Sequence, residues 1–107
     1  MRAVEFRRFL DYDNALRVMF ESERGRIVRF VVQLECQFVE DGEWIAVIRY
    51  DTAHGYAHRD IMHPTKKEEK TKLSVQDYNE AFTIAMEDVT GKRHEYRRRY
   101  EEWLNQK

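Results

Sequence analysis

The segment YDTAHGYAHRDIMHP, residues 50–64, concentrates the side chains of this chain that can do acid–base or metal chemistry. It holds three of the four histidines, two aspartates and an arginine, and the only proline of the chain closes it. A carboxylate beside a histidine holds the imidazole in one tautomer and stabilises its protonated form. His58 with Asp51 has that form. An arginine such as Arg49 or Arg59 would stabilise an anionic oxygen, as cleavage of a phosphodiester requires.

The same histidines admit two other interpretations. His54, His58 and Asp60 have the spacing H-x3-H-x-D of a metal site. Side chains two and four residues apart along a strand are spread over ~7 to 14 Å, so they converge on one ion only if a turn bends His54 back. The remaining interpretation is a polar sheet face whose charged residues pair across strands. The catalytic site that we expect from the sequence contains no metal ion.

Alternation of apolar and polar residues predicts the sheet that positions this segment. In residues 26–39 the even positions from Val28 to Phe38 are apolar, and most odd positions are polar. In residues 43–53 one face carries Trp44, Ala46, Ile48 and Tyr50. A period of two over such lengths is typical of strands with one buried face.

The loops between these strands predict their registers, because a slip of one residue would send every side chain to the wrong face. We expect a three-residue loop at 40–42 with Gly42 left-handed, a three-residue loop at 23–25, and a two-residue turn at His54-Gly55. The expected pairs are Phe38–Trp44, Cys36–Ala46, Leu34–Ile48 and Val32–Tyr50; Phe20–Val28, Val18–Phe30 and Leu16–Val32; and Ile48–Ile61, Asp51–His58 and Arg49–Asp60.

The two ends of the chain complete the predicted fold. Residues 1–10 are expected to form a further strand, residues 11–14 a turn, and Pro64 ends the last strand because it cannot donate to the ladder. Residues 66–72, KKEEKTK, are expected to be a solvated loop. Residues 74–77 resemble a capping box, and apolar residues then recur at helical spacing to Trp103. Gly91 leaves open one long helix or two.

The sequence therefore predicts one α+β domain over residues 1–107. It consists of an antiparallel β-meander of four to five strands (1–64), a loop (65–73) and a helical region (74–107) packed on one face. Arg49, Asp51, His58 and Asp60 then lie together on the open face, flanked by Gln33 and Glu35, displayed rather than buried. His54 lies at the turn and His63 at the far end of the strand.

Composition narrows the classes of protein. The formal net charge is -1, so a globally basic nucleic-acid binder is not indicated. The single cysteine, Cys36, excludes an intrachain disulfide. The N-terminus has no apolar signal-peptide core, and no apolar run approaches the ~18 residues of a membrane span. We expect a cytoplasmic protein that does not enter a membrane.

Residues 44–63 resemble the central segment of TumE-type proteins, small toxin components of prokaryotic toxin–antitoxin loci. In that family a strand ends in an arginine, an aromatic residue, an aspartate and an asparagine, followed by Ala-Pro-His-His and further histidines. The matching residues here are Arg49, Tyr50, Asp51, Ala53 and His54, with His58 and His63 as counterparts of the later histidines. Thr52 replaces the asparagine, no proline follows Ala53, and no two histidines are adjacent.

The resemblance implies a growth-inhibiting protein with RNA as its target and an antitoxin as its protein partner. It favours metal-independent RNA cleavage, in which the 2′-hydroxyl is the nucleophile and no cofactor is needed. His58 would then act as general base or acid, oriented by Asp51, while Arg49 stabilises the phosphate. His54 or His63 would be the second proton-transfer group, and Asp60 would position Arg49.

The basic segment KRHEYRRRYEEW, residues 92–103, offers further contacts to nucleic acid. Arg93, Arg97 and Arg98, together with Arg59, are candidates for gripping an RNA backbone. Alternatively, Tyr96, Tyr100 and Trp103 continue the apolar stripe of the helix and pack on the sheet or on a second subunit, forming a homodimer. The competing function is a non-enzymatic protein–protein interaction module that uses the open sheet face or this basic helix.

Overall fold

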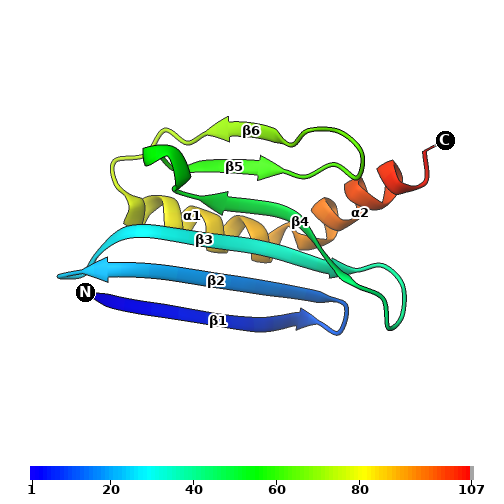
Figure 1. The fold of residues 1–107 in the computed structure, drawn as a ribbon, viewed down its shortest axis with the longest axis horizontal. Coiled ribbons are helices and arrows are strands. Elements are labelled where there is room, and N and C mark those ends of the chain that lie inside the picture. Colours follow the sequence, from blue (N-terminus) through cyan, green and yellow to red (C-terminus); the bar gives the residue numbers. More distant parts are fainter. Residues whose placement is uncertain (107) are drawn as a thin grey trace.

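The computed structural model describes residues 1–106, which form an antiparallel sheet of six strands followed by two helices (Figure 1). Each strand pairs with its neighbours in chain order, as a meander. The strands are β1 (Arg2–Asp11), β2 (Asn14–Glu23), β3 (Arg26–Gln37), β4 (Trp44–Asp51), β5 (His58–Ile61) and β6 (Glu69–Lys72), with a 3-10 turn η1 (Ala53–Gly55) between β4 and β5. The helices are α1 (Tyr78–Gly91) and α2 (Arg93–Leu104). The predicted α+β class is confirmed, with six strands rather than four to five.

The two helices cover one face of the sheet and leave the other open (Figure 1). The core lies between the helices and the even positions of β3, where Phe30, Val32, Leu34 and Cys36 are buried. From α1 the residues Ala81, Ala85 and Val89 face them, and all three are fully buried. This is the apolar face that the alternation predicted.

The strand predicted for residues 1–10 exists as β1, and the turn at residues 11–14 joins it to β2. The register between β2 and β3 differs from the prediction by two residues. Phe20 lies opposite Phe30, because the loop is a two-residue turn with left-handed Arg24 (φ 52°) and Gly25 (φ 77°). A bulge follows between Glu21 and Ser22. A shift of two residues keeps side chains on their predicted face, but the bulge reverses the two residues beside the turn: Ile27 packs against the core and Val28 is 40% exposed.

Between β3 and β4 the predicted pairs Val32–Tyr50 and Leu34–Ile48 are confirmed, and the two pairs beyond them are wrong. A bulge places Cys36 opposite Ile45 and Gln37 opposite Trp44. Trp44 therefore lies on the open face, where its ring centroid is 5.6 Å from that of Phe9.

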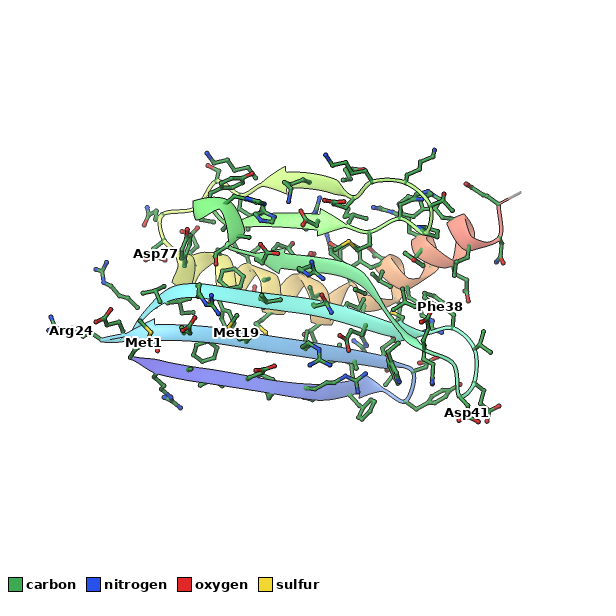
Figure 2. All side chains as sticks on the ribbon, viewed as in Figure 1. Met1, Met19, Arg24, Phe38, Asp41 and Asp77 are labelled. Atoms are coloured by element: carbon green, nitrogen blue, oxygen red, sulfur yellow. The ribbon has the colours of Figure 1, made fainter. Side chains whose placement is uncertain are left out.

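Two turn residues mark the ends of the sheet. Asp41 (φ 58°), not Gly42, takes the left-handed conformation in the loop after β3. It lies at the opposite end of the sheet from Arg24 (Figure 2).

The pairing of β4 with β5 is as predicted, with Ile48 opposite Ile61, Arg49 opposite Asp60 and Asp51 opposite His58. The strand β6 is a correction, because it lies within the segment predicted to be a loop. All four of its residues are exposed, and three of them are charged. A short, charged strand is suited to the edge of a sheet, where it discourages pairing with another chain.

The helical region is two helices, separated at Lys92 (φ -109°, ψ 18°), and the helix begins later than residue 74. Asp77, not Ser74, is the N-cap, and its side chain accepts a hydrogen bond from the backbone N–H of Glu80 (2.9 Å). The Glu80 carboxylate in turn accepts from the N–H of Gln76 (3.0 Å). In the described part of the chain, neither helix has the length and apolar character needed to cross a membrane.

Candidate functional site

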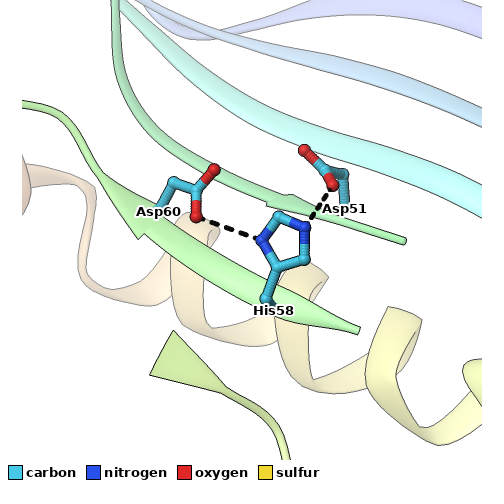
Figure 3. A group of neighbouring side chains, drawn as sticks. All are labelled: Asp51, His58 and Asp60. Carbon is cyan, nitrogen blue, oxygen red and sulfur yellow. Dashed lines mark hydrogen bonds and ion pairs between the residues drawn. The ribbon is translucent and has the colours of Figure 1, made fainter. Parts of the chain in front are cut away.

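The register of β4 and β5 places His58 between two carboxylates (Figure 3). Its Nε2 lies 2.7 Å from Asp51 Oδ1, and its Nδ1 lies 3.0 Å from Asp60 Oδ1. The contact with Asp60 is a hydrogen bond, whereas that with Asp51 is a close ion-pair contact without hydrogen-bond alignment. A doubly protonated imidazole has an N–H on each nitrogen and so suits both neighbours.

This group is on the open face but is buried, so the expectation of a displayed cluster is wrong. His58 is 1% exposed, Asp51 8% and Asp60 5%. Aromatic rings of the β4–β5 connection lie over His58, with centroids at 5.4 Å for Tyr56 and 5.9 Å for His54. β6, a strand that the sequence did not indicate, pairs with β5 and brings Lys70 Nζ to 3.4 Å from His58 Nδ1.

Lys70 on β6 is the member of the group that sequence reasoning missed. Its Nζ donates to both oxygens of Asp60 (3.0 and 3.2 Å) and lies 3.4 Å from His58 Nδ1. The hydrogen bond with Asp60 raises the pKa of Lys70. Asp51, His58, Asp60 and Lys70 form a cluster in which two carboxylates contact an imidazole and an ammonium group, and we call it the His58 cluster.

A metal interpretation survives only with different ligands from those expected. Asp51, His58 and Asp60 offer ligand atoms within 4.8 Å of one another, whereas His54 is outside this set. The two carboxylates contact opposite nitrogens of His58, and one ion can take only one of those nitrogens. Since Lys70 already supplies a cation to Asp60, the geometry fits an ion-pair network better than a metal centre.

Residues directly opposite one another form a polar row across the open face of all six strands. The row is Arg7, Arg17, Gln33, Arg49, Asp60 and Lys70. Beside it, the Glu35 carboxylate accepts from Arg7 (3.0 Å) and Arg17 (2.9 Å). Burial alone would raise the pKa of Glu35, but the hydrogen bonds from Arg17, Arg7 and Gln33 outweigh burial and lower it.

Arg49 differs from the other cations of the row, because its partner is neutral. Its Nε donates to Gln33 Oε1 (2.7 Å), and no carboxylate within residues 1–106 pairs with it. The expectation that Asp60 positions Arg49 is therefore wrong, since Asp60 contacts His58 and Lys70 instead.

A depression of about 530 Å³ lies on the open face beside the His58 cluster. Arg49 and Asp51 are among the residues that line it. The other lining residues are Met19, Arg29, Phe30, Val31, Gln33, Thr52 and Ala53. Asp51 Oδ1 accepts from the N–H of Ala53 (2.9 Å) as well as contacting His58. Asp51 thus connects the depression with the buried imidazole.

The two other histidines of the segment separate. His54 is exposed at the turn, in a left-handed conformation (φ 73°), with its ring beside His58. His63 lies beyond the end of β5, where its Nδ1 accepts from the N–H groups of Thr65 (3.1 Å) and Lys66 (3.0 Å). Its ring centroid lies 4.6 Å from that of Trp103 of α2, with the two rings tilted by 37°, so His63 does not join the cluster.

The arginines expected to grip RNA are mostly engaged within the fold. Arg93 donates to Asp11 (2.8 Å), and Arg97 donates to the carbonyls of Asp13 (2.9 Å) and Gln37 (2.8 Å). Arg59 lies on the helix-covered face of the sheet, opposite Tyr50 in the pairing of β4 with β5, and its Nε is buried. Arg98 is exposed on the outer side of α2.

Comparison with known proteins places the whole described chain in one family. The family described as "Domain of unknown function (DUF7718)" matches residues 1–106. No curated protein and no solved structure matches the chain.

Proposed function

The chain belongs to the DUF7718 family, a domain of unknown function, and we propose that this protein is an RNA-directed, toxin-like protein of the cytoplasm. In this proposal, residues at the depression on the open face cleave RNA without a metal ion. The observation that carries it is the lining of one depression by Arg49 and Asp51, with His58 2.7 Å behind Asp51. The resemblance of residues 44–63 to TumE-type proteins supports the same assignment.

The substrate-binding role falls to Arg49. Its guanidinium is held through Nε by Gln33, which leaves the fork of terminal nitrogens for a phosphate. Arginine binds phosphate oxygens in pairs, and such charge-assisted hydrogen bonds are short and strong. A phosphodiester seated there would lie next to Asp51.

The chemistry requires one group to take a proton and another to give one. The Asp51 carboxylate, which lines the depression and has His58 behind it, accepts the proton of the 2′-hydroxyl, whose oxygen forms a bond to phosphorus while the bond from phosphorus to the 5′-oxygen breaks. His54, exposed beside His58, donates a proton to the departing 5′-oxygen. Asp60 and Lys70 position the imidazole from behind, and His63 has no part.

The test is cleavage of mixed single-stranded and structured RNA by purified protein from pH 5 to 9, with and without chelator. Arg49→Gln is the main variant, because its side chain is partly exposed and its loss should leave the fold intact. Arg99→Gln, which removes an exposed arginine of α2, is the control for lost charge. Asp51→Asn and His54→Gln test the two proton-transfer groups.

We expect chelator-resistant activity with a bell-shaped pH dependence. Arg49→Gln should lower it at least ~100-fold, as removal of one charge-stabilising donor does in other enzymes. Arg99→Gln should keep the activity. Inducing the wild-type protein in bacteria should arrest growth, and Arg49→Gln should relieve the arrest. The absence of cleavage by well-folded wild-type protein throughout this pH range overturns the proposal, and loss of activity to chelator replaces it by a metal-dependent reaction.

The burial of His58 favours a second candidate, a non-enzymatic interaction module. Both ring nitrogens face carboxylates, an arrangement that a purely structural ion-pair network would also have. In that case the open face, or the outer surface of α2 near Arg98 and Arg99, binds a partner protein such as an antitoxin. Binding would then persist in Arg49→Gln and weaken on charge reversal at Arg98 and Arg99.

A further inference from the structure

We propose that this protein forms a symmetric dimer in which β1 pairs antiparallel with β1 of a second copy. The two edges of the sheet differ in a way that points to this. β6 is only four residues long, and a short edge strand offers little backbone for pairing. β1 is ten residues long and lies uncovered at the opposite edge (Figure 1). An exposed strand of that length is a template for another strand.

The sequence of β1 complements itself in one register. When Phe6 lies opposite Phe6 of the second copy, Glu5 of each copy lies opposite Arg7 of the other. These two side chains point to the open face, because Glu5 pairs with Met19 and Arg7 with Arg17 across β2. Opposite charges directly across strands stabilise a pair, and two phenylalanine rings in that position add to it. Arg7 donates through Nε to Glu35 (3.0 Å), so its terminal nitrogens are the donors for Glu5 of the second copy.

The neighbouring registers lack this complementarity. A symmetric antiparallel pair of strands has a two-fold axis perpendicular to the sheet. In every allowed register, one residue therefore lies opposite the same residue of the other copy. Placing Glu5 opposite Glu5 brings like charges together, and placing Arg7 opposite Arg7 does the same. The Phe6 register avoids both.

The resulting assembly is one continuous sheet with six strands from each copy. Because the two-fold axis is perpendicular to the sheet, both helical layers lie on one side and both open faces on the other. The half-buried Phe6 lies on the helix side of β1, opposite Val18 of β2. Pairing covers Phe6 with its own copy. The dimer does not depend on the proposed RNA cleavage.

Disulfide trapping tests the register directly. In the proposed dimer the Cα atoms of the paired residues 6 lie ~4.5–5.5 Å apart, within the ~4.4–6.8 Å that a disulfide spans. Phe6→Cys should therefore cross-link on mild oxidation. The native Cys36 does not interfere, because it is buried and burial raises the pKa of its thiol to about 12.

Matched positions serve as controls. In the Phe6 register the two copies of Val4 are offset by four residues, which is ~13 Å along the strands, so Val4→Cys alone should not cross-link. Val4 lies opposite Arg8 of the other copy, so a mixture of Val4→Cys and Arg8→Cys proteins should form a mixed cross-link. Glu5→Cys and Arg7→Cys report the two competing registers. Each variant is first checked for an unchanged melting temperature.

Light scattering of the wild-type protein supplies the independent measurement. We expect a mass that rises toward twice 13.1 kDa with concentration. Phe6→Lys should shift the protein toward the monomer, since lysine on an edge strand opposes pairing. A monomeric mass at all concentrations, or strongest cross-linking at residue 5 or 7, overturns the proposal. RNA cleavage by a strictly monomeric protein would overturn the dimer while leaving the proposed function standing.

Discussion

At the scale of single residues, the burial of His58 makes it a poor position for a test of the function of the open face. Its side chain is enclosed by Asp51, Asp60, Tyr56 and His54, and Lys70 closes the group from β6. Removing the imidazole leaves a cavity and takes away the ring nitrogens that the buried carboxylates of Asp51 and Asp60 contact. Loss of activity in His58→Ala would therefore mix a chemical effect with a structural one, which is why Arg49 carries the functional test.

We expect His58→Ala to lower the free energy of unfolding by ~2–5 kcal/mol, because it opens a cavity and leaves the buried Asp60 without the hydrogen bond to Nδ1. His94→Ala, which removes an exposed histidine of α2, should change it by no more than ~0.5 kcal/mol. Urea unfolding followed by circular dichroism measures both. Equal stability of the two variants would show that the His58 cluster contributes nothing to the fold.

Most of this cluster could be predicted from sequence, and its burial could not. The alternation of β4 and β5 brings Asp51 opposite His58 through a turn that His54 and Gly55 make recognisable. The cover depends on β6, and the run KKEEKTK has the composition of a solvated loop. A charged edge strand has no apolar alternation, so Lys70 gave no signal of its position.

At the scale of elements, the faces of the strands were predictable and their registers only in part. Faces follow from a period of two, which survives the shift of two residues between β2 and β3 except at Ile27 and Val28, where a bulge lies beside the Arg24-Gly25 turn. The bulge in β4 instead inserts one residue and turns Trp44 to the open face. A bulge of this kind is set by the twist and packing of the whole sheet, which a single strand's sequence does not encode.

The basic segment of α2 is held by the sheet, and Arg97 is the main tether. Its two terminal nitrogens reach the Asp13 carbonyl and Asn14 Oδ1 (both 2.9 Å) and the Gln37 carbonyl (2.8 Å), and its guanidinium lies over the Phe38 ring. These contacts join the β1–β2 turn and the end of β3 to the helix. The contribution of Arg97 to RNA binding that the sequence suggested would require breaking them.

We expect Arg97→Ala to lower the free energy of unfolding by ~2–4 kcal/mol, because hydrogen bonds that involve a charged group are worth ~1.5–3 kcal/mol each and the buried Asn14 loses its donor. Arg98→Ala is the matched control, since it removes a neighbouring arginine that is exposed. Thermal and urea unfolding compare the two. A loss of stability in Arg98→Ala as large as that in Arg97→Ala would contradict the assignment.

At the scale of the whole molecule, one carboxylate joins the sheet to both helices. Asp88 of α1 accepts hydrogen bonds from the hydroxyl of Tyr50 on β4 (2.6 Å) and from that of Tyr96 on α2. Burial, reinforced by the Asp88 carboxylate, raises the pKa of Tyr96 from 10.0 to about 12 and moves that of Tyr50 upward as well. Folding therefore favours the neutral hydroxyls.

The sign of the resulting pH dependence follows. Below pH 10 the tyrosines are neutral in both the folded and the unfolded chain, and their full stabilisation is present. Between pH 10 and about 12 the unfolded chain releases its proton first, so the free energy of unfolding should fall as pH rises. Asp88, Tyr50 and Tyr96 link α1, β4 and α2. The helical circular dichroism and the native fluorescence of Trp44 and Trp103 should therefore be lost together.

Tyr96→Phe identifies the origin of this alkaline transition. The variant loses one titrating hydroxyl, so its stability should start lower at neutral pH and decline less steeply from pH 10 to 12 than that of the wild type. Tyr12→Phe, which changes an exposed tyrosine of the β1–β2 turn, should leave the wild-type profile unchanged. If Tyr96→Phe keeps the wild-type slope, or if helix signal disappears before tryptophan fluorescence changes, Asp88 does not hold the two layers together.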